Sequence, residues 1–167
     1  MTTTNDELLS IARELPLPVP WNRGEFINAL AEMRGRPITL IPTDTATLSG
    51  GPCGLWVARD HDDLIFHEAA TSEYHIDQIV CHEIGHMVLG HDRLDSVEHT
   101  SEHQIDLCRA VMADINPNTV RAVLGRSDFT PEFERDAERF ASIVLLAAAE
   151  RAEQRSPLMR SVFHRST

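Results

Sequence analysis

The stretch from Val80 to His91 constrains this chain more than any other feature. His82 and His86 are four residues apart, so on a helix their imidazoles project from one face about one turn from each other. That spacing lets two ring nitrogens converge on one metal ion at about 2.0–2.1 Å each. Glu83 is offset around the helix, so its carboxylate would reach a water beside the ion more readily than the ion itself. An H-E-x-x-H pattern on a helix is typical of zinc peptidases, in which the glutamate is the general base.

The residues around the motif predict the helix that such a site requires. Thr71 or Ser72 can cap its start, and Gly90 stands where a C-cap glycine would end it. Nine histidines in 167 residues make a chance match with two solvated histidines a real alternative. The helical context favours the metal site, because the apolar residues form a stripe that excludes both histidines: Ile76, Val80, Ile84, Met87 and Val88.

Composition predicts one soluble domain over residues 1–167, with ordinary hydrophobic (42%) and charged (25%) fractions. Neither a secretion signal nor a run of 18 apolar residues is present, so we expect no membrane association. Three cysteines without CxxC pairing fit reduced thiols and a cytoplasmic location. A net charge of −11 argues against direct nucleic-acid binding, because phosphates would be repelled. The sequence does not indicate an oligomeric state.

Periodicity along the chain predicts an α+β fold, in which a small antiparallel sheet packs on a helical core. The core would contain the motif helix and a long C-terminal helix that begins at Thr130-Pro131 and cannot pass Pro157. We expect a helical N-terminal segment over 1–35, the core over 36–155 and a loose tail over 156–167. The other expected helices span 6–15, 22–34, 101–115 and 117–124, and the expected strands span 38–41, 55–59 and 64–67, the last two joined as a hairpin.

A catalytic zinc site needs a third protein ligand. Glu134 is the best candidate, and Glu138, one turn further along the same expected helix, could orient a ligand histidine through its free N–H. The two glutamates could equally be a solvated acidic face. Asp136 is the fallback ligand, with a different face and a shorter reach.

A longer motif with a third histidine would need histidine at position 92, where the chain has Asp92. His91 lies beyond the expected helix end, so we expect an exposed loop histidine there. Cys81 is turned by about 100° from His82 on a helix, which favours a packed thiol over a ligand.

These residues resemble the ImmA/IrrE family of metallopeptidase domains. The resemblance rests on the run from Cys81 to His91 and on the E-x-x-A-E-x-F-A run from Glu134 to Ala141, and it covers roughly residues 36–148. Residues 50–56 are similar to a segment of many actinobacterial members. The resemblance implies that His82, His86 and Glu134 hold zinc and that Glu83 is the catalytic base. The position of Glu138 is commonly asparagine or aspartate in that family.

The resemblance further implies a zinc endopeptidase that cleaves a helix-turn-helix transcriptional repressor. An additional donor should stabilise the oxyanion, and spacing does not choose among the eligible side chains: Tyr74, His91, His99 and His103. The alternative is a non-catalytic, zinc-stabilised binding module that docks to a transcriptional regulator. A fourth protein ligand, such as His91 or His103, would favour that alternative.

Overall fold

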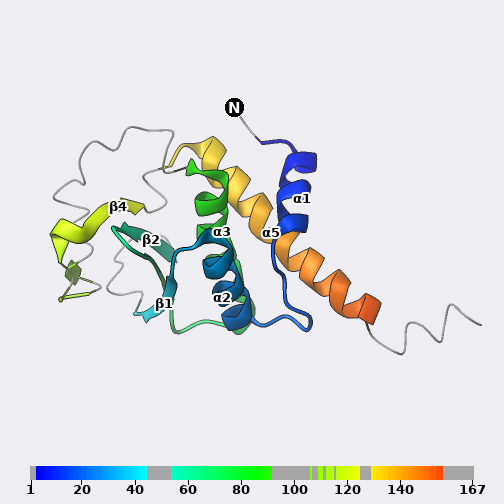
Figure 1. Cartoon of the computed structure of the whole chain (residues 1–167), viewed down its shortest axis with the longest axis horizontal. Coiled ribbons are helices and arrows are strands. Elements are labelled where there is room, and N and C mark those ends of the chain that lie inside the picture. The colour runs from blue at the N-terminus through cyan, green and yellow to red at the C-terminus, as the bar shows by residue number, and fades with distance from the viewer. Residues whose placement is uncertain are drawn as a thin grey trace, which may run out of the picture.

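The computed structural model describes residues 3–44, 54–91, 106, 109–110, 112–114, 116–124 and 129–155. Its architecture is α+β, as predicted. In Figure 1 the strands lie on one side of the helix that carries the motif, and the first and last helices lie on the other. The elements, in chain order, are α1 (Asn5–Glu14), α2 (Arg23–Arg34), β1 (Ile38–Thr43), β2 (Gly54–Arg59), β3 (Asp63–Glu68), α3 (Glu73–Leu89), the 3-10 turn η2 (Pro117–Thr119), β4 (Val120–Leu124) and α5 (Pro131–Arg155).

Local capping signals define the helices as predicted. The Ser72 side chain accepts a hydrogen bond from the His75 amide at the start of α3, and Gly90 ends this helix with a left-handed φ of 70°. At the start of α5, the Thr130 hydroxyl oxygen accepts from the Phe133 amide at 3.3 Å. Of the helix expected over 101–115, the structure describes only residues 106, 109 and 110 as helical, and the tail expected over 156–167 lies outside the described residues.

The sheet has the strand order β1-β3-β2-β4 and is mixed, whereas the sequence predicted an antiparallel sheet. β2 and β3 form the expected antiparallel hairpin, with Gly54 opposite His67 and Trp56 opposite Ile65. β1 pairs with β3 in parallel, from Ile38 opposite Asp63 onward. β3 therefore lies between β1 and β2. This strand order depends on tertiary packing rather than on any local sequence pattern.

The expected helix over 117–124 is wrong. The chain makes one 3-10 turn and then enters β4, which pairs antiparallel with β2 and places Val123 opposite Val57. Val120 and Val123 are β-branched, and a short apolar run cannot be assigned to helix or strand by periodicity alone. Val123 is buried in a small apolar cluster with Leu55, Val57, Leu64 and Phe66. Pairing with β2 therefore covers the edge of the hairpin and decides the conformation.

The main core lies between the sheet and the helices. Trp56 and Ile65 extend from the sheet into the cluster that α3 and α5 supply with Val80 and Phe140. The N-terminal helices share this cluster, with Leu8 from α1 and Phe26 from α2 both fully buried. α3 is thus packed against the sheet on one side and against α5 on the other, which fixes the motif helix in both directions. Among the described residues, no helix is long and apolar enough to cross a membrane.

Asp63, at the start of β3, is 1% exposed and anchors the hairpin. Its carboxylate accepts hydrogen bonds from Trp56 Nε1 at 3.0 Å and from Arg36 Nε at 2.8 Å. Arg34 Nη2 lies 3.3 Å from the same carboxylate. A buried carboxylate is tolerated only with such partners, because taking the charge out of water is costly. The network therefore ties the end of α2 to the hairpin of β2 and β3.

Candidate metal centre

His82, His86 and Glu134 converge on one point between α3 and α5. The two Nε2 atoms of the histidines lie 3.1 Å apart. Glu134 Oε2 lies 3.5 Å from His82 Nε2, and Glu134 Oε1 lies 3.3 Å from His86 Nε2. A carboxylate more than forty positions along the chain thus meets both imidazoles, as the sequence predicted for the third ligand.

The spacing of these atoms fits one metal ion. Donor atoms bound at about 2.0–2.1 Å in tetrahedral geometry lie about 3.3 Å from one another, and the three contacts of 3.1, 3.3 and 3.5 Å bracket that value. His86 is 0% exposed, and Glu134 is 9% exposed. His82, Glu134 and His86 therefore form a group that could hold a metal ion.

Gly85 explains how α5 comes close enough to supply Glu134. A Cβ built at Gly85 would lie 3.1 Å from Phe140 Cδ1 and 3.2 Å from Ala137 Cα. Such contacts are tighter than ordinary van der Waals packing, so the two helices pack as closely as a glycine and an alanine allow. Gly85 lies inside the motif between the two histidines, and no pattern in the sequence indicates its packing role.

The charges and the burial of the site shift the pKa values of its three ligand candidates. Burial acts to raise the pKa of Glu134, but hydrogen bonds and charges of His82 and His86 outweigh it and lower this pKa to about 2. Burial likewise acts to lower the pKa of His82, yet the carboxylate of Glu134 and the charges of Glu83 and Glu138 raise it overall. The pKa of His86 is lowered, first by burial and then by the charge of His82. Glu134 is thus held in the anionic form that a metal ligand needs.

Glu83 lies on α3 beside His82 and is buried, with 4% of its surface exposed. Burial raises the pKa of this carboxyl to about 8, and the charge of Glu134 adds to the rise while His82 opposes it. A divalent cation on the neighbouring ligands would favour the carboxylate form. Glu83 therefore has the desolvated position and the adjustable proton affinity expected of a general base.

The expectation that His91 is an exposed loop histidine is wrong. It is 5% exposed, its ring stacks on Phe133 with centroids 4.2 Å apart, and its Nδ1 lies 2.8 Å from His86 Nδ1. His86 presents Nε2 to Glu134, so His91 contacts the opposite side of the ring and orients it. His86 also stacks on Phe129 at 3.6 Å. Sequence spacing could not find this contact, because the two phenylalanines that hold the rings are more than thirty residues away.

The remaining predicted residues fall in different places. Asp136, the fallback ligand, accepts hydrogen bonds from the Thr3 amide at 2.7 Å and from Arg139 Nη1 at 3.3 Å, so it anchors the N-terminal segment instead. Tyr74 is 65% exposed. Cys81 is a buried free thiol, as predicted, and burial raises its pKa.

Glu138 is exposed, and its charge contributes to the raised pKa of His82. Its predicted hydrogen bond to a ligand histidine stays a prediction. His99 and His103 lie outside the described residues.

Comparisons of the chain with protein-family models, with curated proteins and with solved structures find no match. The geometry of the site therefore carries the functional argument.

Proposed function

We propose that this protein is a zinc-dependent endopeptidase. The observation that carries the proposal is the convergence of His82, His86 and Glu134 beside the buried carboxylate of Glu83. Two imidazoles and one carboxylate are a common ligand set of catalytic zinc sites, which use three protein ligands where structural sites use four. Among the described residues the group has three members, and His91 faces the side of His86 away from Glu134. This supports a catalytic site over the structural zinc of a binding module.

Zinc held by these ligands would polarise a scissile carbonyl and lower the pKa of a coordinated water to about 7. Glu83 would accept the proton of the attacking water and pass it to the leaving amine. Glu134 and His86 hold their positions through α5 packing and through His91, so the site needs little rearrangement before reaction. His82, with 19% of its side chain exposed against 1% for His86, marks the side from which a substrate would approach.

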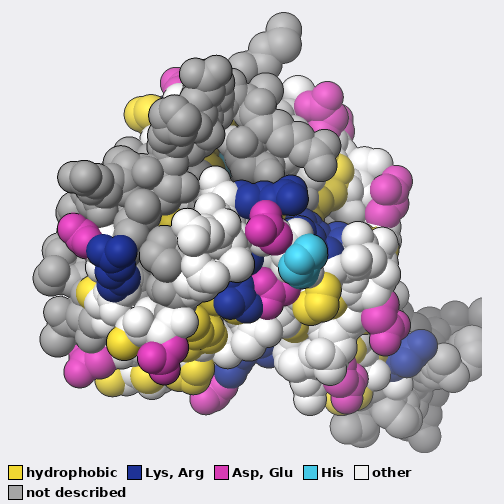
Figure 2. Space-filling view, turned by 60° about the vertical axis from the view of Figure 1, so that its left-hand side comes forward, with side chains coloured by type: hydrophobic (Ala, Val, Ile, Leu, Met, Phe, Trp, Pro, Cys, Tyr) yellow, Lys and Arg dark blue, Asp and Glu magenta, His cyan; other side chains and the backbone are white. Residues whose placement is uncertain are grey.

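The proposed substrate is a helix-turn-helix transcriptional repressor, on the strength of the resemblance to ImmA/IrrE metallopeptidases. The net charge of −11 would attract a basic partner over a distance. On the face in Figure 2 the described acidic side chains are scattered among arginines rather than gathered in one patch. The charge therefore supports attraction in general and indicates no specific docking point.

The test is to incubate the zinc-loaded protein with helix-turn-helix repressors from the same organism, beginning with any encoded by a neighbouring gene, and to look for discrete fragments. Glu83→Gln should retain zinc and lose cleavage by about 10²-fold or more. Unchanged cleavage in Glu83→Gln would remove Glu83 from the mechanism. Bound zinc without any cleavage of the repressor would favour the binding module.

A further inference from the structure

Gly54, the first residue of β2, lies against the general base of the proposed mechanism. A Cβ built at this residue would lie 2.6 Å from Glu83 Oε1 and 3.3 Å from Glu83 Cδ. The same Cβ would lie 2.7 Å from Ile79 Cγ2. Contacts below 3.0 Å between a Cβ and another heavy atom essentially do not occur in proteins. The Glu83 carboxylate thus occupies the space that any other residue at position 54 would fill.

The carboxylate of Glu83 lies in buried surroundings. Gly54 is paired with His67 on β3, and both residues are buried. Side chains paired across antiparallel strands point to the same face of the sheet, so His67 lies on the face toward which a Cβ at Gly54 would point. Glu83 itself is 4% exposed, so its carboxylate is packed inside the protein and a shift would have to occur among buried neighbours. A backbone φ in the left-handed region does not explain this glycine, because among the described residues positive φ occurs at Gly35 and Gly90 and not at Gly54.

We infer that Gly54 is a positioning residue for Glu83. The absence of a side chain at the start of β2 lets the sheet approach α3 closely and gives the Glu83 carboxylate its place beside the ligand histidines. The placement of the carboxylate does not depend on what the protein does, whereas its consequence for hydrolysis rests on the proposed peptidase function.

The expected effect of an alanine at this position follows from the distances. Relief of a 2.6 Å contact to an ordinary separation of about 3.5 Å requires the carboxylate to move by roughly 1 Å. A displacement of that size at a catalytic group can cost about 10²-fold in rate. The three heavy atoms nearest to a Cβ at this position belong to Glu83 and Ile79 and none to a metal-ligand candidate, so zinc affinity should change by less than about threefold. Loss of hydrolysis with retained zinc is the signature that separates a moved base from a damaged metal site.

The test compares Gly54→Ala with Gly24→Ala. A Cβ at Gly24, in α2, would meet only Asn22 Oδ1, at 3.4 Å, which is ordinary contact. Two readouts are used: zinc affinity measured with Zn²⁺ alone, and the side-chain carboxyl ¹³C resonance of Glu83 in the metal-free protein, assigned by its loss in Glu83→Gln. Gly54→Ala should shift this resonance and leave zinc affinity unchanged, and Gly24→Ala should change neither. Repressor cleavage by the zinc-loaded variants gives a third readout.

Ile79→Ala keeps the test decisive if the methyl group of Gly54→Ala disturbs folding through Ile79. In the double variant the contact to Ile79 is removed and the contact to Glu83 remains, with Ile79→Ala alone as the reference. The double variant should still shift the Glu83 resonance and still lose cleavage. An unshifted resonance in both backgrounds would overturn the inference. If the wild-type protein cleaves nothing, the peptidase proposal fails, while the resonance still decides the role of Gly54.

Discussion

The Nδ1 atoms of His86 and His91 lie 2.8 Å apart, so one ring donates a hydrogen bond to the other. If His86 held a metal through Nε2, its Nδ1 would carry the proton and donate a hydrogen bond to the lone pair of His91 Nδ1. His91 would then carry its own proton on Nε2. In the proposed site His91 would thus hold the buried His86 ring in the orientation that metal binding requires.

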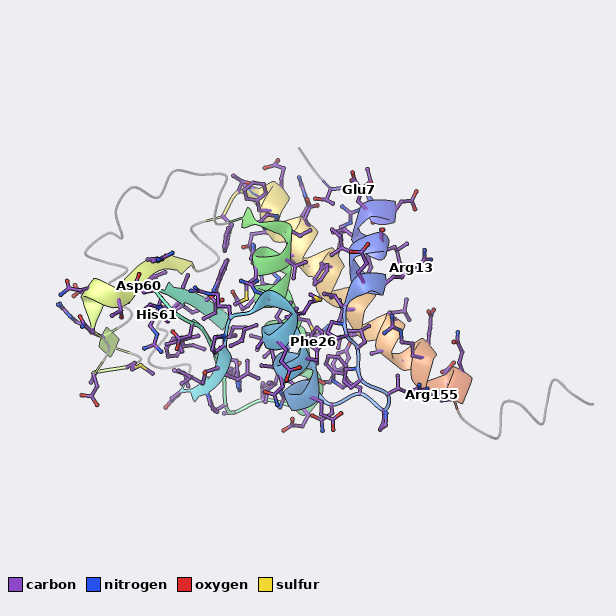
Figure 3. The ribbon with its side chains drawn as sticks, in the orientation of Figure 1. Glu7, Arg13, Phe26, Asp60, His61 and Arg155 are labelled. Carbon is purple, nitrogen blue, oxygen red and sulfur yellow. The ribbon has the colours of Figure 1, made fainter. Side chains whose placement is uncertain are left out.

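Replacement of His91 by phenylalanine should weaken zinc binding by about 10–100-fold. The variant keeps a ring that can stack on Phe133, so the loss isolates the hydrogen bond from the packing. Competition with a chromogenic zinc chelator measures the affinity. The control is His61→Ala, since His61 is exposed in the turn between β2 and β3, beside Asp60 in Figure 3, and is not a member of the metal-ligand group. Equal affinities in wild type and His91→Phe would show that His91 does not orient the ligand.

An alanine at Gly85 should separate the motif helix from α5. The new methyl group would lie 3.1 Å from Phe140 Cδ1 and 3.3 Å from the carbonyl oxygen of Ala137, and overpacking of this kind costs about 1–3 kcal/mol of stability. Because Glu134 is carried on α5, zinc affinity should fall as well. Chemical denaturation of the metal-free protein and a zinc titration test the two effects. The account is wrong about this interface if Gly85→Ala is as stable as wild type.

Zinc binding at pH 7 should release a proton from Glu83. In the metal-free protein the pKa of this buried carboxyl is raised to about 8, so the group is mostly protonated at pH 7, and a neighbouring divalent cation lowers the pKa. Titration calorimetry in buffers of different ionisation enthalpy counts the protons. Glu83→Gln should release fewer protons than wild type, and the affinity of the wild type should rise as the pH increases from 6 to 8. Equal proton release in both proteins would contradict the raised pKa.

The same shift has a consequence for the stability of the metal-free protein. The folded state holds the proton of Glu83 up to a pKa of about 8, whereas the ordinary value is 4.5. Between these pH values the native state binds more protons than the unfolded state, so the free energy of unfolding falls as pH rises. Glu83→Gln, which cannot ionise, should therefore gain stability relative to wild type from pH 5 to pH 8. Parallel stability curves for the two proteins would argue against it.

Asp63→Asn should destabilise the fold by about 2–3 kcal/mol. The substitution removes the buried charge that faces Arg36 and Arg34, and breaking a buried ion pair is costly, although the partly exposed arginines can still reach water. Asp62→Asn is the matched control, because Asp62 pairs with Arg59 nearer the surface and such pairs contribute at most about 1 kcal/mol. Urea denaturation measures both. A loss in Asp63→Asn no larger than that in Asp62→Asn would refute the anchoring role.

Much of the fold was predictable where the determining interactions are local. The Ser72 and Gly90 caps, the Thr130-Pro131 start and the apolar stripe of the motif helix all act within a few residues, so the limits of α3 and the start of α5 agree with the sequence. β4 was not predictable, because its conformation depends on a hydrogen-bonding partner over sixty residues away.

The features of the site likewise divide into those that local spacing predicts and those that depend on contacts between elements. The helical spacing of His82 and His86 is a local property, and the motif predicted their shared face. Spacing favoured Glu134 over Asp136 but left open whether Glu134 belongs to a metal site or to a solvated acidic face, and this is decided by which face of α5 meets α3. The roles of Gly54, Gly85 and His91 depend on contacts across elements, which no pattern within one element can indicate.

The most direct test of the account is the zinc content and affinity of Glu134→Gln compared with Glu132→Gln. Both glutamates lie in the first turn of α5, but only Glu134 meets the two histidines, while Glu132 is exposed and pairs with Arg135. We predict one tightly bound zinc per chain in wild type and in Glu132→Gln, and a large loss of affinity in Glu134→Gln. If Glu134→Gln binds zinc as tightly as wild type does, the proposed three-ligand centre is wrong.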